Sequence, residues 1–192
     1  LMSKPKKFIY NSKNVCGRIF DYFKKILNTD ISVPTELNYL QEKYLDEASK
    51  LFKNDKKYVG FSITAGHPTR KKEISLKTIV EVANYFSDKN FVPTFFIEEK
   101  YEDKINTIKT MVKNSYFPEH FVKSSLRNPF LVIAMGKKLD SAISINNGIM
   151  HMLGLAGTRT AIFFDENSDK FRPLNNNKSK IYYSSNNKEA KD

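Results

Sequence analysis

The sequence predicts an α/β domain in which a parallel β-sheet carries helices on both faces. From Tyr58 onward, short apolar segments rich in β-favouring residues alternate with longer segments whose apolar residues recur at helical spacing. Such alternation is typical of parallel strands joined by right-handed crossovers. The chain has 192 residues, of which 40% are hydrophobic and 13% aromatic, so it can bury one ordinary domain core and carry an appendage.

The first half of the alternation contains two strands, each followed by a helix. The strands are predicted over 58–64 and 91–97 and the helices over 76–86 and 101–114. Ser75 is the expected N-cap of the first helix, because its hydroxyl can accept a hydrogen bond from a free backbone N–H. Pro93 lies inside the second strand and favours an edge position or a bend, since proline cannot donate to a strand ladder.

The second half begins with an apolar run, 130–138, that suits either a strand or a helix. Asn128 and Pro129 precede it as an N-cap followed by proline at the first helical position, so a helix is favoured. The remaining elements are predicted as a strand over 142–145, a helix over 148–157 that Gly157 closes, and a strand over 160–164.

Residues 1–54 precede this alternation and contain two further predicted helices. In 17–27 the apolar residues share one helical face, beside Arg18, Lys24 and Lys25. That face is suited to docking on a neighbouring domain, which is the favoured interpretation, or to lying on a membrane surface. In 33–52 the apolar stripe consists of Leu37, Leu40, Tyr44, Ala48 and Leu51, with Thr35 as the expected N-cap. The polar stretch 53–57 marks a domain boundary, which divides the chain into 1–54 and 55–192.

The charge balance favours anionic partners. Lys and Arg number 32 against 21 Asp and Glu, for a formal net charge of +11. Such a surplus attracts phosphate groups, although lysines occur along the whole chain and a solvated surface is the favoured explanation; no nucleic-acid partner is expected. Cys16 is the only cysteine and fits a reducing compartment. Without a signal peptide or an apolar run of about 20 residues, the sequence predicts a cytoplasmic protein.

Two polar, glycine-containing turns, 64–75 and 146–151, follow predicted strands. Ligands of parallel sheets bind outside the carboxyl ends of the strands, so these turns are the candidate site. In the first turn, Gly66 lets a ligand approach the backbone, and Thr69, Arg70, Lys71 and Lys72 supply a hydroxyl and three cations before a helix. That combination suits a pyrophosphate, although an ordinary solvated connection has the same composition.

The second turn consists of Asn146, Asn147 and Gly148, with a helix expected from about Ile149. Either asparagine can cap the helix, and Gly148 permits a positive φ or close approach of a phosphate. His151 lies near the helix N-terminus, where its ring can donate to an anionic oxygen; from spacing alone, a packed helix residue is the favoured interpretation.

Both turns resemble glycosyltransferase family 9, the heptosyltransferases that build the inner core of lipopolysaccharide. "TAGHPTRKKEISL" resembles the family's "HPGA…KRWP" loop, and 143–173 resembles its stretch "GNDSGPMHLAAALGTPTVALFGPT" without a gap. The resemblance covers roughly residues 36–183. Identical positions in the second stretch include Gly148, Met150, His151, Gly157, Thr158, Thr160 and Phe164.

The resemblance implies a GT-B fold, in which two Rossmann-like domains enclose the active site. Residues 55–192 would be the C-terminal, donor-binding domain and 1–54 the tail of the N-terminal acceptor domain with a linking helix. The donor is a nucleotide-diphosphate sugar, ADP-heptose in the best-known members. The general base would belong to the N-terminal domain, most of which is outside this chain. We therefore expect no transfer by the 192 residues alone and assign them no catalytic residue.

The resemblance also assigns donor contacts. Lys72 or Lys71 matches the lysine that contacts the donor phosphates, while Asn146 and Asn147 stand where the family has aspartate and serine or threonine. Asn146 thereby removes a negative charge beside the donor. The predicted donor-binding residues are Gly66, Thr69, Lys71, Lys72, Asn146, Asn147, Gly148 and His151. The family is metal-independent, and the three histidines His67, His120 and His151 show no metal-ligand spacing, so no metal or cofactor is expected.

The function expected from these features is transfer of a sugar, heptose in the best-known members, to a lipid-linked, lipopolysaccharide-type glycan. The partners would be the nucleotide-sugar donor, the acceptor and, peripherally, the cytoplasmic face of the inner membrane. Two alternatives remain. A non-catalytic nucleotide-binding or interaction module accommodates Asn146 and the missing domain. A sugar-nucleotide epimerase of the same fold is less favoured, because paired acidic residues and histidines are not found in the predicted cleft.

Overall fold

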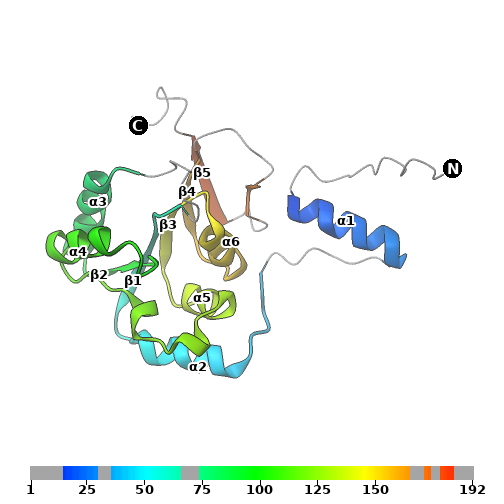
Figure 1. Ribbon diagram of the computed structural model, residues 1–192, viewed down its shortest axis with the longest axis horizontal. Helices are drawn as coiled ribbons and strands as arrows, with labels where there is room; N and C mark the ends of the chain where they lie inside the picture. Colours follow the sequence, from blue (N-terminus) through cyan, green and yellow to red (C-terminus); the bar gives the residue numbers. More distant parts are fainter. Residues whose placement is uncertain (1–14, 30–35, 66–73, 165–170, 174–177, 184–192) are drawn as a thin grey trace.

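The computed structural model describes residues 15–29, 36–65, 74–164, 171–173 and 178–183. These residues form a five-stranded, all-parallel sheet in the order β2-β1-β3-β4-β5 (Figure 1). The strands are β1 (Lys57–Ser62), β2 (Phe91–Phe95), β3 (Ser141–Ile145), β4 (Thr160–Phe164) and β5 (Ser179–Tyr183). The predicted α/β class with a parallel, Rossmann-like sheet is confirmed.

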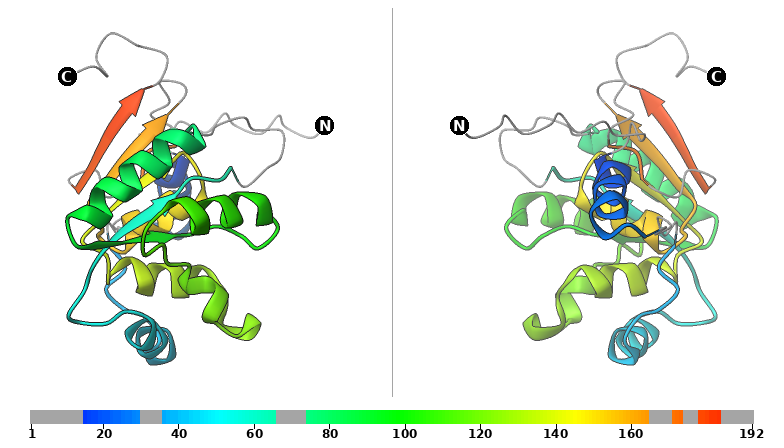
Figure 2. Two further views of the ribbon diagram at one scale, coloured as in Figure 1. Left: turned by 90° about the vertical axis from the view of Figure 1, so that its left-hand side faces the viewer. Right: turned by 90° about the vertical axis from the view of Figure 1, so that its right-hand side faces the viewer.

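Helices cover both faces of the sheet. They are α1 (Val15–Leu27), α2 (Glu42–Leu51), α3 (Leu76–Asp88), α4 (Glu102–Met111), α5 (Pro129–Gly136) and α6 (Gly148–Leu155), with 3₁₀ turns η1 (Pro118–Phe121) and η2 (Ser124–Leu126). One core cluster joins α3 and α4 to one face, and another joins α2, α5 and α6 to the other. In Figure 2, α3 and α4 face the viewer on the left, whereas α1 and α6 face the viewer on the right.

Local signals place most helix ends where the sequence predicts them. Ser75 Oγ accepts from the Thr78 N–H at 3.1 Å, and Asn128 Oδ1 accepts from the N–H groups of Phe130 and Leu131. Gly157 ends α6 with φ +76°, a conformation that side-chain-bearing residues rarely adopt. These caps satisfy backbone groups that the helices cannot satisfy internally.

Pro93 lies on the edge strand, as predicted. β2 pairs with β1 alone among the strands, and the far side of β2 meets Tyr116. The Tyr116 N–H donates to the Pro93 carbonyl at 2.8 Å, and the Phe95 N–H donates to the Tyr116 carbonyl at 2.7 Å. The missing proline N–H therefore leaves no gap in a central ladder.

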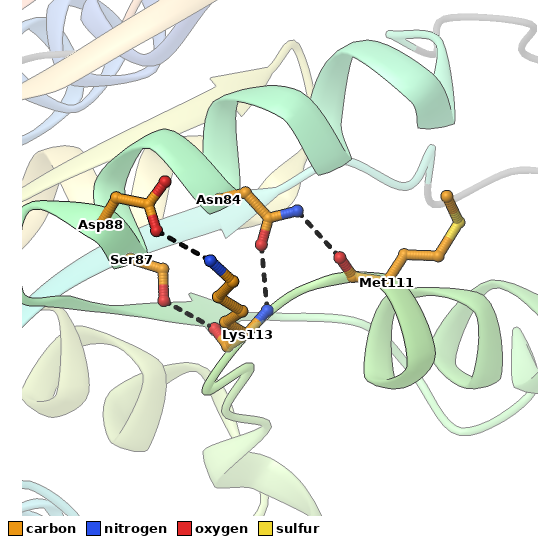
Figure 3. A network of polar contacts seen from close by, with 5 residues as sticks. All are labelled: Asn84, Ser87, Asp88, Met111 and Lys113. Atoms are coloured by element: carbon orange, nitrogen blue, oxygen red, sulfur yellow. Dashed lines mark hydrogen bonds and ion pairs between the residues drawn. The ribbon is translucent and has the colours of Figure 1, made fainter.

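A polar network fastens the end of α4 to α3 (Figure 3). The Asn84 side chain donates to the Met111 carbonyl at 2.8 Å and accepts from the Lys113 N–H at 3.0 Å. Ser87 Oγ donates to the Lys113 carbonyl, and Lys113 Nζ forms an ion pair with Asp88 at 3.1 Å. The backbone groups exposed by the end of α4 thus find partners on α3, which holds the α4 layer on the sheet.

The start of α2 corrects one prediction. The helix begins at Glu42, not just after Thr35, which itself lies outside the described residues. Residues 37–41 instead form a non-helical strap. The Leu37 N–H donates to the Leu155 carbonyl at 2.7 Å, and Leu40 is buried in the core, so tertiary contacts override the helical pattern in the strap. Tyr44 and Ala48 are buried as predicted.

One other feature differs from the predictions. The sequence pattern predicts no strand after residue 164, whereas the structure adds β5, which is short and only partly buried because it lies at the sheet edge. The docking of the apolar face of α1 on a neighbouring domain stays a prediction; within the described chain, that face contacts none of the three core clusters. The domain boundary after residue 54 stays a prediction. Helix α2, which precedes that boundary, packs in one hydrophobic core with α5, which follows it.

Candidate functional site

The two turns singled out from the sequence follow neighbouring strands. β1 and β3 are adjacent and parallel, with Ser62 opposite Ser144 at their carboxyl ends. The turn after β1 and the turn after β3 therefore leave the same edge of the sheet. Asn147 joins them directly, although 85 residues separate it from Ser62.

The Asn147 side chain is fully engaged in holding this turn. Its Oδ1 accepts from the Met150 N–H at 2.9 Å and caps α6. Its Nδ2 donates to Ser62 Oγ at 2.8 Å and to the Thr64 carbonyl at 3.1 Å. An amide group has two N–H donors, so both have partners. The predicted capping role is confirmed for Asn147, and the side chain positions the turn instead of pointing free amide hydrogens at a ligand.

Gly148 is the first residue of α6, at the start of the predicted range 148–157, and it is exposed. Its φ is not positive, which corrects one of the two reasons given for a glycine here. A Cβ added to Gly148 would meet no heavy atom within 4 Å. The second reason, open space in front of a helix N-terminus, remains: a ligand can approach the backbone there closely.

A cavity of about 540 Å³ opens beside this turn. Asn147, Gly148 and Met152 line it from α6, while Asn128 and Pro129 line it from the start of α5. Two helix N-termini thus border the same cavity. Because backbone N–H groups and the positive ends of helix dipoles gather at helix N-termini, this wall favours an anionic group.

Another wall of the cavity carries carboxylates. Glu98 and Glu99 follow β2, and Glu119 belongs to η1. Burial raises the pKa of Glu119; the charge of Arg127 opposes the shift and Glu98 adds to it. Arg127 Nη1 forms an ion pair with Glu99 at 2.8 Å. The cavity therefore combines a wall that attracts anions with a wall rich in hydrogen-bond acceptors.

His120 borders the same wall and is held in place by the backbone. Its Nε2 lies 3.1 Å from the Ile97 carbonyl, which can only accept, so Nε2 carries the proton. Sequence reasoning missed this wall. The rule that ligands bind beyond strand ends would have identified Glu98 and Glu99 after the second predicted strand. No sequence period indicated Glu119 or His120, because η1 is a single short turn.

The predicted site residues are only partly brought together. Asn147 and Gly148 line the cavity; Asn146 and His151 are half-buried nearby but do not line it. Burial lowers the pKa of His151, which keeps the ring neutral at pH 7. The other predicted residues, Gly66, Thr69, Lys71 and Lys72, lie outside the described residues. The described range 36–65 ends at Ala65, one residue after Thr64 of the cavity wall.

Among the described residues, no three His, Cys, Asp or Glu side chains gather as a metal site requires. Across the helices of the described ranges, none combines the length and the apolar character needed to cross a bilayer.

Solved structures share this architecture. A glycosyl transferase family 9 protein from Veillonella parvula DSM 2008 matches with a TM-score of 0.72 and 14% identity, over 92% of this chain and 52% of that one. The E. coli ADP-heptose LPS heptosyltransferase II matches with a TM-score of 0.62 and 13% identity, over 80% of this chain and 46% of that one. The fold is that of glycosyltransferase family 9.

The likeness of fold confirms the structural part of the resemblance inferred from the two turns, an α/β domain built on an all-parallel sheet. This chain spans about half the length of the structures it matches. No protein-family model matches the chain, and no curated protein matches its sequence.

Proposed function

We propose that this chain is the donor-binding half of a glycosyltransferase and that the cavity beside Asn147 holds a nucleotide-diphosphate sugar. The observation that carries the proposal is the open N-terminus of α6 at Gly148, facing a cavity whose other wall bears three glutamates. A volume of about 540 Å³ suits a nucleotide-sized ligand. The fold shared with a heptosyltransferase that acts with ADP-heptose supports the same function.

The diphosphate would lie at the α6 N-terminus. Gly148 leaves room for a phosphate oxygen against the backbone, and the α5 N-terminus adds a second set of N–H groups. Lys71 and Lys72 follow Thr64 by seven and eight residues, so the chain is long enough to bring their charges to the same group. Asn147 supports this arrangement by fastening the turn to Ser62.

The nucleoside would extend toward the acidic wall. Ribose hydroxyls and exocyclic amino groups are donors, and carboxylates such as Glu98 and Glu119 accept from them. Ile149 and Met152, which line the cavity between the two walls, offer apolar surface to a base. The carboxylates of this wall would repel the diphosphate. The ligand would therefore bind in one orientation, with its nucleoside toward the glutamates.

In the transfer reaction, the bond between the anomeric carbon and the diphosphate oxygen breaks while the acceptor hydroxyl forms the new glycosidic bond. Backbone N–H groups at Gly148, with Lys72 and His151, would stabilise the charge that develops on the leaving diphosphate. The acceptor proton passes to a base of the acceptor-binding half, which we place outside this chain. These 192 residues would therefore bind the donor without transferring its sugar.

Calorimetric titration with ADP, UDP, GDP and CDP tests this proposal. We expect one of them to bind, and Lys72→Ala and His151→Ala to weaken that binding. Lys53→Ala is the matched control, because Lys53 lies in a different pocket, beside the amino end of β2. The absence of binding by all four diphosphates, or binding that neither substitution weakens, contradicts the proposal.

The protonation of His151 gives a second measurement. Because its pKa is lowered in the free protein, contact with a diphosphate would raise it and draw in a proton at pH 7. The binding enthalpy should then depend on the ionisation enthalpy of the buffer, and His151→Ala should remove that dependence. A buffer-independent enthalpy would exclude His151 as a phosphate contact.

A non-catalytic nucleotide-binding module is the second candidate. Asn146 supports it, since this residue stands where the resemblance has aspartate and supplies no charge. Both candidates predict diphosphate binding. They differ when a nucleotide sugar, a glycan acceptor and a polypeptide carrying the acceptor-binding half are added: the transferase releases the nucleoside diphosphate, whereas the binding module leaves the nucleotide sugar intact.

A further inference from the structure

A second cavity, the amino-end pocket, lies at the amino ends of β1 and β2 and has a volume of about 630 Å³. Residues between 50 and 58, at the start of β1, and Phe91, at the start of β2, contribute to its lining. The cavity beside Asn147 reaches β2 from its other end, at Phe96. Because a strand rises by about 16 Å over five residues, the two cavities lie at opposite ends of the strands, and they share no lining residue.

Two tyrosine hydroxyls line the amino-end pocket. Tyr58 is only 4% exposed, and its hydroxyl accepts from the Lys53 N–H at 2.9 Å, but no residue that the structure describes accepts the proton of that hydroxyl. The Tyr116 hydroxyl donates to the Leu51 carbonyl at 2.9 Å and keeps a lone pair that can accept. Burial, with a smaller contribution from Tyr58, raises the pKa of Tyr116 to about 12, so this hydroxyl stays neutral. A buried donor without an acceptor is costly, so Tyr58 favours a polar ligand here.

An exposed aromatic ring forms one wall of the pocket. Phe121 is 70% exposed and stacks on Tyr116, with ring centroids 5.8 Å apart and planes inclined by 23°. Tyr116 is held in turn by the rings of Phe52 and Tyr58. The face of an aromatic ring carries partial negative charge and attracts positively polarised C–H groups, which a sugar ring presents on its faces. Phe121 is therefore a supported platform for a sugar ring.

Three polar side chains that line the pocket are not engaged elsewhere. Asn90, Asn114 and Ser115 have no side-chain hydrogen bond with any other residue of the described ranges. Tight turns fix the positions of the two asparagines, which have φ angles of 63° and 55°. Amide and hydroxyl groups both donate and accept, as sugar hydroxyls do, so these side chains suit a ligand with several hydroxyl groups.

The pocket also has a surplus of positive charge. Lys53 and Lys56 line it and form no ion pair with the described part of the chain, whereas Lys50 pairs with Glu47 at 3.2 Å. Asp55 is the one carboxylate in the lining. Two cations without partners against one carboxylate favour a ligand that carries an acid group.

We propose that the amino-end pocket binds a sugar that carries a carboxylate or a phosphate. The sugar ring would pack on Phe121, with its hydroxyls at Asn114 and Tyr58. Its acid group would lie near Lys53 and Lys56. A nucleotide is a poorer fit, because a planar base lacks the hydroxyl groups that would pair with side chains that both donate and accept.

This pocket does not depend on the proposed donor site. Sugar transfer would take place beyond the carboxyl ends of the strands, so the acceptor-binding half would face that edge and leave the amino-end pocket open. A sugar bound at the amino ends would lie away from the reacting groups. The pocket would then be an accessory carbohydrate site.

Nuclear magnetic resonance titration of the ¹⁵N-labelled chain tests this proposal. The ligands are methyl β-D-glucuronide, glucose 6-phosphate and the neutral methyl β-D-glucoside. The two acidic sugars should shift the amide signals of 53–58 and 114–121 and leave those of 147–152 unchanged. The neutral glucoside should bind at the same place at least about threefold more weakly, because it lacks the charge that the lysines attract.

Pairs of variants separate the ring from the cations. Phe121→Ser should weaken binding of all three sugars at least about fivefold, whereas Tyr39→Ser, which removes an exposed ring outside the pocket, should not weaken it. Lys53→Gln/Lys56→Gln should lower the affinity for the acidic sugars to that for the glucoside. Lys43→Gln/Lys137→Gln removes two charges outside the pocket and should leave that difference in place.

Tyr58→Phe removes only a hydroxyl and keeps the ring in the core. It should weaken binding of each sugar about threefold, because the ligand loses a buried donor. None of the other substituted residues belongs to a core cluster, so those variants should keep the cooperative unfolding of the wild type by circular dichroism.

Four results would overturn the proposal. The first is that neither acidic sugar binds, and the second is that their binding shifts the signals of 147–152 instead. The third is displacement of the glucuronide by ADP, which would make the pocket a nucleotide site. The fourth is loss of sugar binding when a polypeptide carrying the acceptor-binding half is added, which would make that half the occupant of the pocket.

Discussion

Replacement of Asn147 tests whether the turn after β3 is held by the three hydrogen bonds of one side chain. Asn147→Ala removes the cap of α6 and both links to the end of β1. Asn147→Asp keeps an oxygen for the Met150 N–H but replaces the donor that faces the Thr64 carbonyl. The Ser62 hydroxyl can rotate and donate to the aspartate, so only the Thr64 link is lost outright.

The expected losses follow from these contacts. An N-cap contributes about 1 kcal/mol, and each further hydrogen bond to a buried partner contributes about 1 kcal/mol. Ser62 is fully buried and Thr64 nearly so. Asn147→Ala should therefore lower the free energy of unfolding by about 2–3 kcal/mol, and Asn147→Asp by about 1–2 kcal/mol. For a chain of this size, the alanine variant should melt roughly 4–12 °C below the wild type.

Urea denaturation followed by circular dichroism measures these values. Ser62→Ala serves as the matched variant, because it deletes one acceptor and leaves the cap and the Thr64 link in place. The double variant should lose less than the sum of the single losses, since the two side chains interact. The reasoning is refuted if Asn147→Ala costs less than about 0.5 kcal/mol, or if Asn147→Asp is the more damaging change.

Three other substitutions follow from local geometry and charge. Gly157→Ala should lower the free energy of unfolding by at least about 1 kcal/mol, since φ is +76° and the new Cβ would lie 2.9 Å from the Glu36 carboxyl carbon; an unchanged urea midpoint would contradict this. Burial lowers the pKa of His151 below 6.5, so the unfolded chain binds more protons below that pH. Wild-type stability should then fall as the pH drops from 6.5 toward the folded pKa, and denaturation series at several pH values should show a flatter fall for His151→Gln. Burial raises the pKa of Glu119 above 4.5, so ionising it costs stability as the pH rises through the folded pKa. Glu119→Gln should be more stable than wild type at pH 7, with the gain gone below pH 4.5. The prediction is wrong if the variant and the wild type are equally stable at both pH values.

The sequence predicts elements whose signals are local. Ser75 and Asn128 cap helices through residues at most three positions away, and Gly157 ends a helix through its own backbone conformation. The ends of these helices therefore follow from the local sequence alone. Pro93 indicates an edge strand for the same reason, because its missing N–H is a property of one residue.

The sequence does not predict features that depend on contacts between distant segments. The strap before α2 has a helical pattern, but the hydrogen bond between Leu37 and Leu155 and the burial of Leu40 keep it non-helical. For Asn147 the capping role is local and was predicted; its bond to Ser62 joins residues 85 apart and was not. The glutamates of the cavity wall come from β2 and η1, which only the fold brings together.

The most direct test of the donor site is a single methyl group at Gly148. A Cβ there meets nothing in the free protein and the backbone needs no positive φ, so Gly148→Ala should keep or raise the free energy of unfolding, by up to about 1 kcal/mol. The same methyl group would occupy the space that a phosphate needs. Calorimetric titration should therefore show affinity for the preferred nucleoside diphosphate at least about tenfold weaker in this stable variant. Unchanged affinity in Gly148→Ala would contradict the placement of the diphosphate at the α6 N-terminus.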